Sequence, residues 1–387
     1  MKKSTQFQLS FMMFLEFFIW GGWFVTLGSF LGNNLNATGA ETGMAYSTQS
    51  WGAIIAPFII GLIADKFFNA EKILGVLHIV GAVLMYQMSQ SNEFATFYPY
   101  VLGYMIAYMP TLALVNSVSF NQMKDPAKEF PLVRVFGTIG WILAGLIISF
   151  VFKWDSIEMI GNGMLSNTFT MVAIASAVLG VFSFTLPKTP PKGKGEKTSI
   201  SDILGLDALK LLKDRNFLVF FVSSVLICIP LAFYYQNISP FLTEYKVENS
   251  TAWASIGQIS EVGFMLLLPF FFKKYGFKKT ILFGMLAWGI RYVLFAYGNA
   301  GDLFFMLVIG IALHGICYDF FFVSGQIYTD SKAGDKVKSA AQGLITLATY
   351  GIGMLVGFWV AGKIVDKNIL ADGTHSWQDV WLFPALF

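Results

Sequence analysis

Long apolar segments alternate with short polar ones along nearly the whole of this sequence. A helix needs about 20 mostly apolar residues to cross the hydrocarbon core of a bilayer, so each long segment predicts a membrane-spanning helix. The segments lie at residues 7–31, 43–64, 72–90, 95–119, 132–152, 165–186, 216–240, 250–272, 279–298, 302–327 and 339–364, and another begins near residue 380. The pattern predicts an all-α integral membrane protein with twelve transmembrane helices, of which this chain of 387 residues carries eleven and a fragment of the twelfth.

The composition supports a membrane protein and excludes several other classes. Hydrophobic residues make up 56% of the chain and charged residues 13%, about half of the roughly 25% that is usual in soluble domains. Disorder is excluded because 17% of the residues are aromatic. A formal net charge of +3 is too small to indicate a nucleic-acid partner. Because the chain is so apolar, the lipid bilayer is its expected surrounding.

The sequence shows no pattern typical of a catalytic or metal site. Its two cysteines, Cys228 and Cys317, lie inside apolar segments and its three histidines are scattered, so there is neither a disulfide framework nor a metal-ligand spacing. No nucleophile–base pair can be recognised either. We therefore expect no metal and no cofactor, and a membrane-embedded enzyme is the least favoured class.

The distribution of Lys and Arg predicts how the chain is oriented in the membrane. Of the 26 Lys and Arg residues, 20 fall in segments on the same side as the N-terminus, four fall on the other side, and two, Arg134 and Arg291, lie within predicted spans. Cytoplasmic loops of membrane proteins carry the excess of positive charge. The N-terminus is therefore predicted to be cytoplasmic.

A polar stretch at residues 187–214 is the one long connection between predicted spans. It begins with prolines and a run of Gly and Lys, and its second half has the pattern of an amphipathic helix on a membrane surface. This basic cytoplasmic linker would separate six spans at residues 1–186 from those at residues 215–387. Glycines recur at matching positions in spans five and eleven, which indicates a duplicated transporter with two pseudo-symmetric six-helix bundles.

Ionisable side chains within the predicted spans are candidates for function, because each costs about 2.5 to 3.5 kcal/mol to insert at the centre of a membrane. They are Glu16, Arg134, Glu261, Arg291, His314 and Asp319. For two of them a structural role is a strong alternative, Glu16 as a buried hydrogen-bonding group and Arg291 as a packing or gate charge. His78 stands alone on an apolar helix face and is expected to be structural.

Polar and aromatic side chains gather on helix faces in four of the predicted spans, mostly at spacings of three, four or seven residues. These groups are Arg134, Thr138 and Trp141; Tyr235 and Gln236; Gln258 and Glu261; and His314 and Tyr318. Amides that donate and accept hydrogen bonds, together with aromatic planes for stacking, suit a small polar ring compound as substrate. Carboxylates that can take up protons suit coupling to a proton gradient.

Several segments resemble the bacterial nucleoside:proton symporter family of the major facilitator superfamily. They read FLEFFIWGGW at 14–23, AYMPTL at 107–112, FPLVRVFGTIG at 130–140, QISE at 258–261 and YDFF at 318–321. The resemblance implies a major facilitator fold in the bacterial inner membrane and import of nucleosides, such as uridine or adenosine, with protons. It also implies that five residues line or couple the central site, with Glu261 and Asp319 as the leading proton-linked carboxylates. The five are Arg134, Thr138, Gln258, Glu261 and Asp319.

The sequence departs from the family pattern at positions expected near the substrate. Glu16 stands where the family has Gln, which adds a further candidate for proton coupling, and His314 stands where the family has Tyr. In span seven the amides are Gln236 and Asn237, displaced along the helix from the family's positions. Two alternatives therefore stay open: a proton-coupled carrier of another polar solute, such as a sugar or glycoside, and a non-transporting membrane sensor that binds a ligand.

Overall fold

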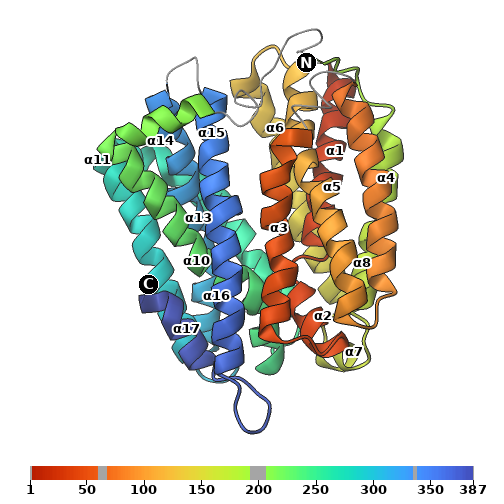
Figure 1. The fold of residues 1–387 in the computed structure, drawn as a ribbon, viewed down its shortest axis with the longest axis vertical. Coiled ribbons are helices and arrows are strands. Elements are labelled where there is room, and N and C mark those ends of the chain that lie inside the picture. Colours follow the sequence, from red (N-terminus) through yellow and green to blue (C-terminus); the bar gives the residue numbers. More distant parts are fainter. Residues whose placement is uncertain (1, 60–67, 192–205, 334–337, 387) are drawn as a thin grey trace. The chain divides into compact units, whose positions relative to one another are not determined.

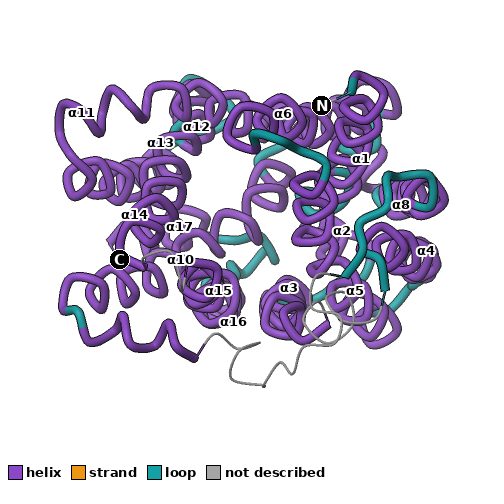
Figure 2. The backbone as a smooth tube through the Cα atoms, turned by 90° about the horizontal axis from the view of Figure 1, so that it is seen from above, coloured by secondary structure: helices purple, strands orange, loops and turns teal. Residues whose placement is uncertain are grey.

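The computed structural model describes residues 2–59, 68–191, 206–333 and 338–386. Helices joined by short loops account for nearly all of this part of the chain, and no strand occurs in it (Figure 2). An isolated antiparallel bridge joins Ile369 and His375.

Figure 1 shows the helices in chain order. Those before the predicted linker are α1 (Lys3–Gly21), α2 (Leu27–Asn34), α3 (Gly39–Ile59), α4 (Ala70–Ser89), α5 (Phe94–Asn121), α6 (Pro126–Leu146), η2 (Ile147–Phe152), α7 (Ile157–Gly161) and α8 (Ser166–Ser183). Those that follow are η3 (Leu206–Lys213), α10 (Arg215–Glu244), α11 (Ser250–Tyr297), α12 (Phe304–Ala312), α13 (His314–Tyr318), η4 (Asp319–Val323), α14 (Ser324–Ala333), α15 (Lys338–Thr346), η5 (Leu347–Gly353), α16 (Met354–Lys367) and α17 (Trp377–Leu386).

Among the described residues, 8 helical stretches are long and apolar enough to cross a membrane. The longest of them, α11, contains two of the predicted spans, which meet at Gly276 where the backbone has a positive φ of 73°. The first predicted span corresponds to α1 and α2, which a turn at residues 22–26 separates. The second corresponds to α3, and its predicted end at residues 60–64 lies outside the described residues. The order of helices confirms the predicted all-α membrane fold.

The chain divides into two compact units. Unit 1 comprises residues 1–36 and 48–203, and unit 2 comprises residues 37–47 and 204–387. The predicted linker is described only at its ends, because residues 192–205 lie outside the described part. In the second half of the linker, where the sequence predicts an amphipathic helix, residues Leu206–Lys213 form the 3₁₀ helix η3.

Asp214 joins η3 to α10 and caps that helix. Its Oδ1 accepts hydrogen bonds from the backbone N–H groups of Asn216 at 2.8 Å and Phe217 at 3.1 Å, and its Oδ2 lies 3.1 Å from the Lys332 ammonium. The Phe217 N–H, the Lys332 ammonium and the Asn216 N–H stabilise the charged carboxylate. They hold the pKa of Asp214 below its ordinary value.

Glycines set the close helix packing in unit 1, where α1 packs against α6, and α4 packs against α5 and α8 (Figure 1). A Cβ atom at Gly140 of α6 would clash with the backbone carbonyl oxygen of Phe14 in α1. One at Gly75 of α4 would lie 2.9 Å from the carbonyl oxygen of Gly180 in α8. Small residues at such contacts let membrane helices approach closely.

Unit 2 is built on α10, α11 and α16, with the first turns of α3 attached. A Cβ atom at Gly357 of α16 would lie 2.6 Å from the Ala232 Cβ in α10, so these two helices also pack closely. The Asp366 carboxylate of α16 accepts from the N–H groups of Gly39 at 2.6 Å and Ala40 at 2.8 Å. A carboxylate is favourable at this position because the first N–H groups of a helix have no partner within the helix.

Candidate substrate and proton sites

Three predicted substrate residues, Arg134, Thr138 and Trp141, lie on α6 in unit 1. Because α6 is a continuous helix, their spacing places all three on the same side. This side meets α1: the Arg134 guanidinium carbon lies 4.0 Å from the centre of the Phe17 ring, and the rings of Trp141 and Trp20 lie 5.6 Å apart. The guanidinium therefore makes a cation–π contact, and all three side chains remain half-buried.

In unit 2 an aromatic cluster forms around His314, and it includes three of the predicted residues. The His314 ring lies 6.4 Å from the Tyr235 ring and 5.7 Å from the Tyr318 ring. Tyr318 continues the cluster, since its hydroxyl lies 2.7 Å from the hydroxyl of Tyr350. Tyr234 stacks on His314 at 5.3 Å, a contact that the sequence analysis did not predict. The cluster joins α10, α13 and η5.

Arg291 is fully buried beside this cluster and bonds directly to His314. Its Nη1 lies 3.1 Å from the Nδ1 atom of His314, and its guanidinium carbon lies 3.5 Å from the centre of the Tyr234 ring. An arginine side chain can only donate, so Nδ1 must accept. The contact assigns His314 the neutral form with its hydrogen on Nε2, and Arg291 acts as the group that orients it.

Asp319 and Glu261, both in unit 2, are the carboxylates that the family resemblance implies are linked to the proton. Asp319 is fully buried, and neither of its carboxylate oxygens has a hydrogen-bond partner in the described part of the chain. Glu261 is half-buried on α11, and an electrostatic interaction links it to Asp319. Asp319 also begins the π-helix η4, and π-helical turns within α-helices are frequent at functional sites.

A close contact between α11 and α13 brings the Gln258–Glu261 segment to His314. The N–H of Gly315 donates to the Ser260 hydroxyl at 3.0 Å, and a Cβ atom at Gly315 would lie 2.6 Å from the Ser260 backbone. A Cβ atom at Gly257 would lie 3.2 Å from the His314 Cβ. The predicted residues of spans eight and ten therefore lie on adjoining helices.

The amides of span seven have an environment that the sequence analysis did not predict. Gln236 is buried against α16, where its amide can donate to the carbonyl of Phe358 at 3.2 Å and accept from the N–H of Gly362 at 3.3 Å. The amide nitrogen of Asn237 is buried without a hydrogen-bond partner in the described part of the chain. Gln236 thus ties α10 to α16, and its contact with substrate stays a prediction.

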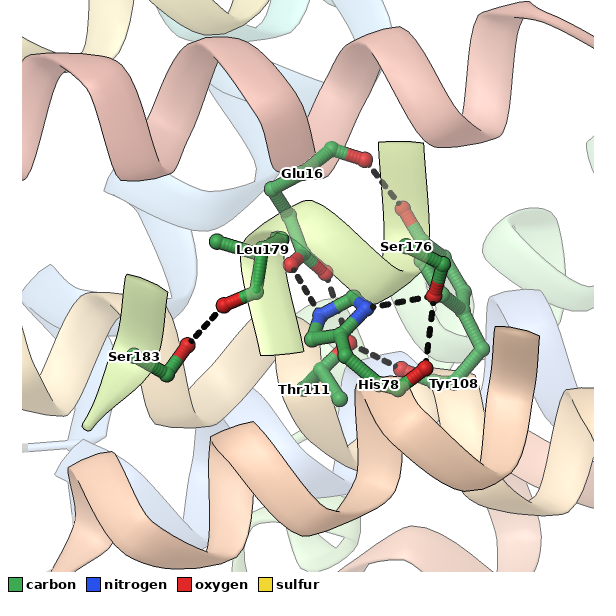
Figure 3. A network of polar contacts seen from close by, with 7 residues as sticks. All are labelled: Glu16, His78, Tyr108, Thr111, Ser176, Leu179 and Ser183. Atoms are coloured by element: carbon green, nitrogen blue, oxygen red, sulfur yellow. Dashed lines mark hydrogen bonds and ion pairs between the residues drawn. The ribbon is translucent and has the colours of Figure 1, made fainter. Parts of the chain in front are cut away.

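Glu16 lies in a buried polar network of unit 1 (Figure 3). Its Oε2 is 2.8 Å from the Nε2 atom of His78, its Oε1 is 2.6 Å from the Thr111 hydroxyl, and its backbone carbonyl accepts from the Tyr108 hydroxyl at 2.7 Å. The sequence predicts that His78 is an isolated structural residue, but in the structure it is the direct partner of Glu16. The two residues are 62 positions apart, so no helix-face argument could have paired them.

The fold is that of a secondary transporter of the major facilitator type. Residues 3–387 match the family described as "Nucleoside H+ symporter", and the chain belongs to this family. It is 45% identical to the putative nucleoside transporter YegT of Escherichia coli, over 99% of this chain and 91% of that protein. It is 36% identical to xanthosine permease of Escherichia coli, over 98% of this chain and 92% of that protein. The crystal structure of nucleoside transporter NupG superposes with a TM-score of 0.88 at 31% identity, covering 98% of this chain and 95% of that one.

These findings confirm the predicted family and fold. The protein is a multi-pass membrane transporter that couples nucleoside movement to protons, and it is not an enzyme.

Proposed function

We propose that this transporter imports nucleosides together with protons across the bacterial inner membrane, with its N-terminus in the cytoplasm. The orientation is supported by the 20 Lys and Arg residues predicted on the side of the N-terminus against four on the other side. The names of the relatives support nucleosides as the substrate class. Uridine, adenosine and xanthosine are therefore the substrates to test.

The aromatic cluster of unit 2 supports recognition of a ring compound. Tyr235 and Tyr318 offer ring faces for stacking on the base, and the His314 Nε2–H donates to an acceptor on the nucleoside. The amides of Gln236 and Gln258 are the other proposed substrate contacts in this unit. In unit 1, Arg134, Thr138 and Trp141 are proposed to contact the substrate during the transport cycle.

The observation that carries the proton coupling is the burial of Asp319 without hydrogen-bond partners in the described part of the chain. An ionised carboxylate in such a place is costly, and the nearby Glu261 makes it costlier when both are charged. Taking up a proton removes this cost. We propose that the Glu261–Asp319 pair binds one proton with the nucleoside, and that its release in the cytoplasm accompanies release of the substrate.

Uptake of labelled nucleoside into liposomes, with and without an inward proton gradient, tests this function. One proton per nucleoside multiplies the limiting accumulation by about tenfold per pH unit of gradient when no membrane potential is present. The Asp319→Asn and Glu261→Gln variants should each lower the limiting accumulation of nucleoside by about tenfold per pH unit of gradient. Exchange of internal for external nucleoside should continue in both variants. The Asp302→Asn variant, which changes an exposed loop carboxylate of unit 2, is the matched control and should behave as the unmodified protein.

Two results would contradict the proposal. Absence of gradient-driven accumulation by the unmodified, folded protein would reject proton-coupled nucleoside import. Full accumulation by both carboxylate variants would reject the assignment of the proton to this pair.

A further inference from the structure

A second acid–base pair, Glu16 with His78, is buried in unit 1, away from Glu261 and Asp319 in the sequence and in a different unit. Their side chains are 0% and 2% exposed. The pair joins α1 to α4, and its hydroxyl neighbours Thr111 and Ser176 come from α5 and α8 (Figure 3). Four helices therefore meet at one ionisable pair.

Each of the two hydroxyl groups lies between two hydrogen-bond acceptors but has only one hydrogen to donate. Ser176 Oγ is 2.9 Å from the backbone carbonyl oxygen of His78 and 3.2 Å from its Nδ1 atom. Thr111 Oγ1 is 2.5 Å from the carbonyl oxygen of Tyr108 and 2.6 Å from Glu16 Oε1. Both hydroxyls can thus turn between a backbone carbonyl and the acid–base pair.

In this arrangement the hydrogen-bonding atoms of the His78 ring and the Glu16 carboxylate keep their partners with or without one extra proton. Without it, His78 donates from Nε2 to the Glu16 carboxylate, and the Ser176 hydroxyl donates to Nδ1. With it, the proton sits on Nδ1 and is donated to Ser176 Oγ, whose own hydrogen turns to the His78 carbonyl. The pair then becomes an imidazolium and a carboxylate with no net charge, and no heavy atom has to move.

The pair also lies next to the substrate residues predicted in unit 1. Phe17, which follows Glu16, packs against the Arg134 guanidinium at 4.0 Å. Trp20, one turn further along α1, packs at 5.8 Å on Tyr108 and at 5.6 Å on Trp141. A change in the net charge of the pair therefore occurs beside positions of α1 that contact Arg134 and Trp141.

The other ionisable groups near the pair come from α5 and α6. Tyr104 and Tyr108 interact electrostatically with Glu16, and Arg134 interacts electrostatically with Tyr108. The tyrosines are neutral near pH 7. Loss of the proton from the pair therefore leaves one net negative charge there, which the Arg134 cation favours.

We propose that Glu16 and His78 form a second proton-binding site, which takes up one proton with the nucleoside in addition to the proton at the Glu261–Asp319 pair. The inference rests on the proposed proton-coupled import. The proton is gained at Nδ1 when the nucleoside binds and is lost from the same atom when the nucleoside is released. No bond between heavy atoms forms or breaks.

The Glu16→Gln variant tests the second site, because glutamine can keep the contacts to His78 and Thr111 but removes the negative charge that stabilises the His78 imidazolium. With a gradient of one pH unit and no membrane potential, two protons per nucleoside set a limiting accumulation of about 100-fold, and one proton sets about 10-fold. We expect about 100-fold for the unmodified protein and about 10-fold for Glu16→Gln, with exchange of internal for external nucleoside still measurable. Accumulation of about 100-fold by the variant would overturn the second site and leave the proposed function intact.

Glu71→Gln is the matched control. Glu71 is another buried glutamate of unit 1, but it accepts from the Thr189 N–H at 2.9 Å and the Asn69 amide at 2.8 Å. The Glu71→Gln variant should keep the limiting accumulation of about 100-fold.

A second measurement tests the site if Glu16→Gln fails to exchange nucleoside. Proton uptake by the unmodified protein on addition of uridine is then measured in detergent with a pH indicator. Two protons per uridine would support the second site, and one would overturn it.

Discussion

At the scale of single residues, the contacts of His314 decide which chemistry an imidazole in a membrane span performs. A histidine in this position could carry a proton. The Arg291 guanidinium, however, donates to its Nδ1 atom at 3.1 Å, so that atom has to stay an acceptor. The imidazole is therefore a neutral, oriented donor through Nε2, which suits recognition of a substrate acceptor rather than transport of a proton.

The His314→Asn variant should weaken nucleoside binding without changing the proton ratio. The asparagine carbonyl can still accept from Arg291, but the Nε2–H donor is lost. Loss of one hydrogen bond costs about 0.5–1.5 kcal/mol, so KM for uridine should rise by up to roughly tenfold with the maximal rate retained. A lowered limiting accumulation with an unchanged KM would instead identify His314 as a proton carrier.

The His314→Leu variant is the companion to this measurement. It leaves Arg291 Nη1 without its acceptor, and an unsatisfied buried donor costs about 1–3 kcal/mol. The unfolding temperature in detergent should therefore fall for His314→Leu and stay nearly unchanged for His314→Asn.

At the scale of elements, glycine positions determine which helices can meet closely. The contact of α1 with α6 depends on Gly140, where an added Cβ would meet the rigid backbone of Phe14 rather than a movable side chain. The same contact holds Phe17 against Arg134 and Trp20 against Trp141. Helix packing and the predicted substrate face of unit 1 therefore depend on one another.

The Gly140→Ala variant should separate α1 from α6. Overpacking of this kind costs about 1–3 kcal/mol, so we expect a lower unfolding temperature in detergent, together with a higher KM for nucleoside. Gly32→Ala in α2 is the control, because an added Cβ there meets nothing within 4 Å. Equal unfolding temperatures for the two variants would show that the α1–α6 contact is not tight.

At the scale of the whole molecule, the uneven distribution of Lys and Arg governs orientation in the membrane. The net charge of only +3 hides this asymmetry, since acidic residues offset the total but contribute little to orientation. Both native cysteines, Cys228 and Cys317, are buried, so a cysteine introduced at the surface can be labelled with little background.

Labelling of intact cells with a membrane-impermeant maleimide tests the orientation. Ala371→Cys, in the exposed loop between α16 and α17, should react from outside the inner membrane. Lys278→Cys, an exposed position after Gly276, should react only after the cells are broken. The reverse pattern would place the N-terminus on the outer side.

The sequence by itself determined the membrane spans, the class of all-α membrane transporter and the family. Runs of about 20 apolar residues have to be helices in a membrane, since lipid offers no partner for a backbone N–H or C=O group. The spans therefore follow from local composition, and α4, α5 and α10 lie within a few residues of their predicted ranges. Two departures from the predicted spans also have local causes. Gly276 allows the backbone of α11, which contains two predicted spans, to turn, and residues 22–26 interrupt the first predicted span.

Only the tertiary structure decided which ionisable groups face one another. Helix periodicity orders residues within one span, but it carries no information about which face of another span packs against it. Glu16 and His78, and likewise Arg291 and His314, come from different helices, so their pairing depends on helix packing. The sequence predicts a structural role for His78 and favours a packing or gate charge for Arg291, because it does not show the partner of either residue. The protonation of a buried group depends on the donors and acceptors around it, and these are set by the three-dimensional arrangement.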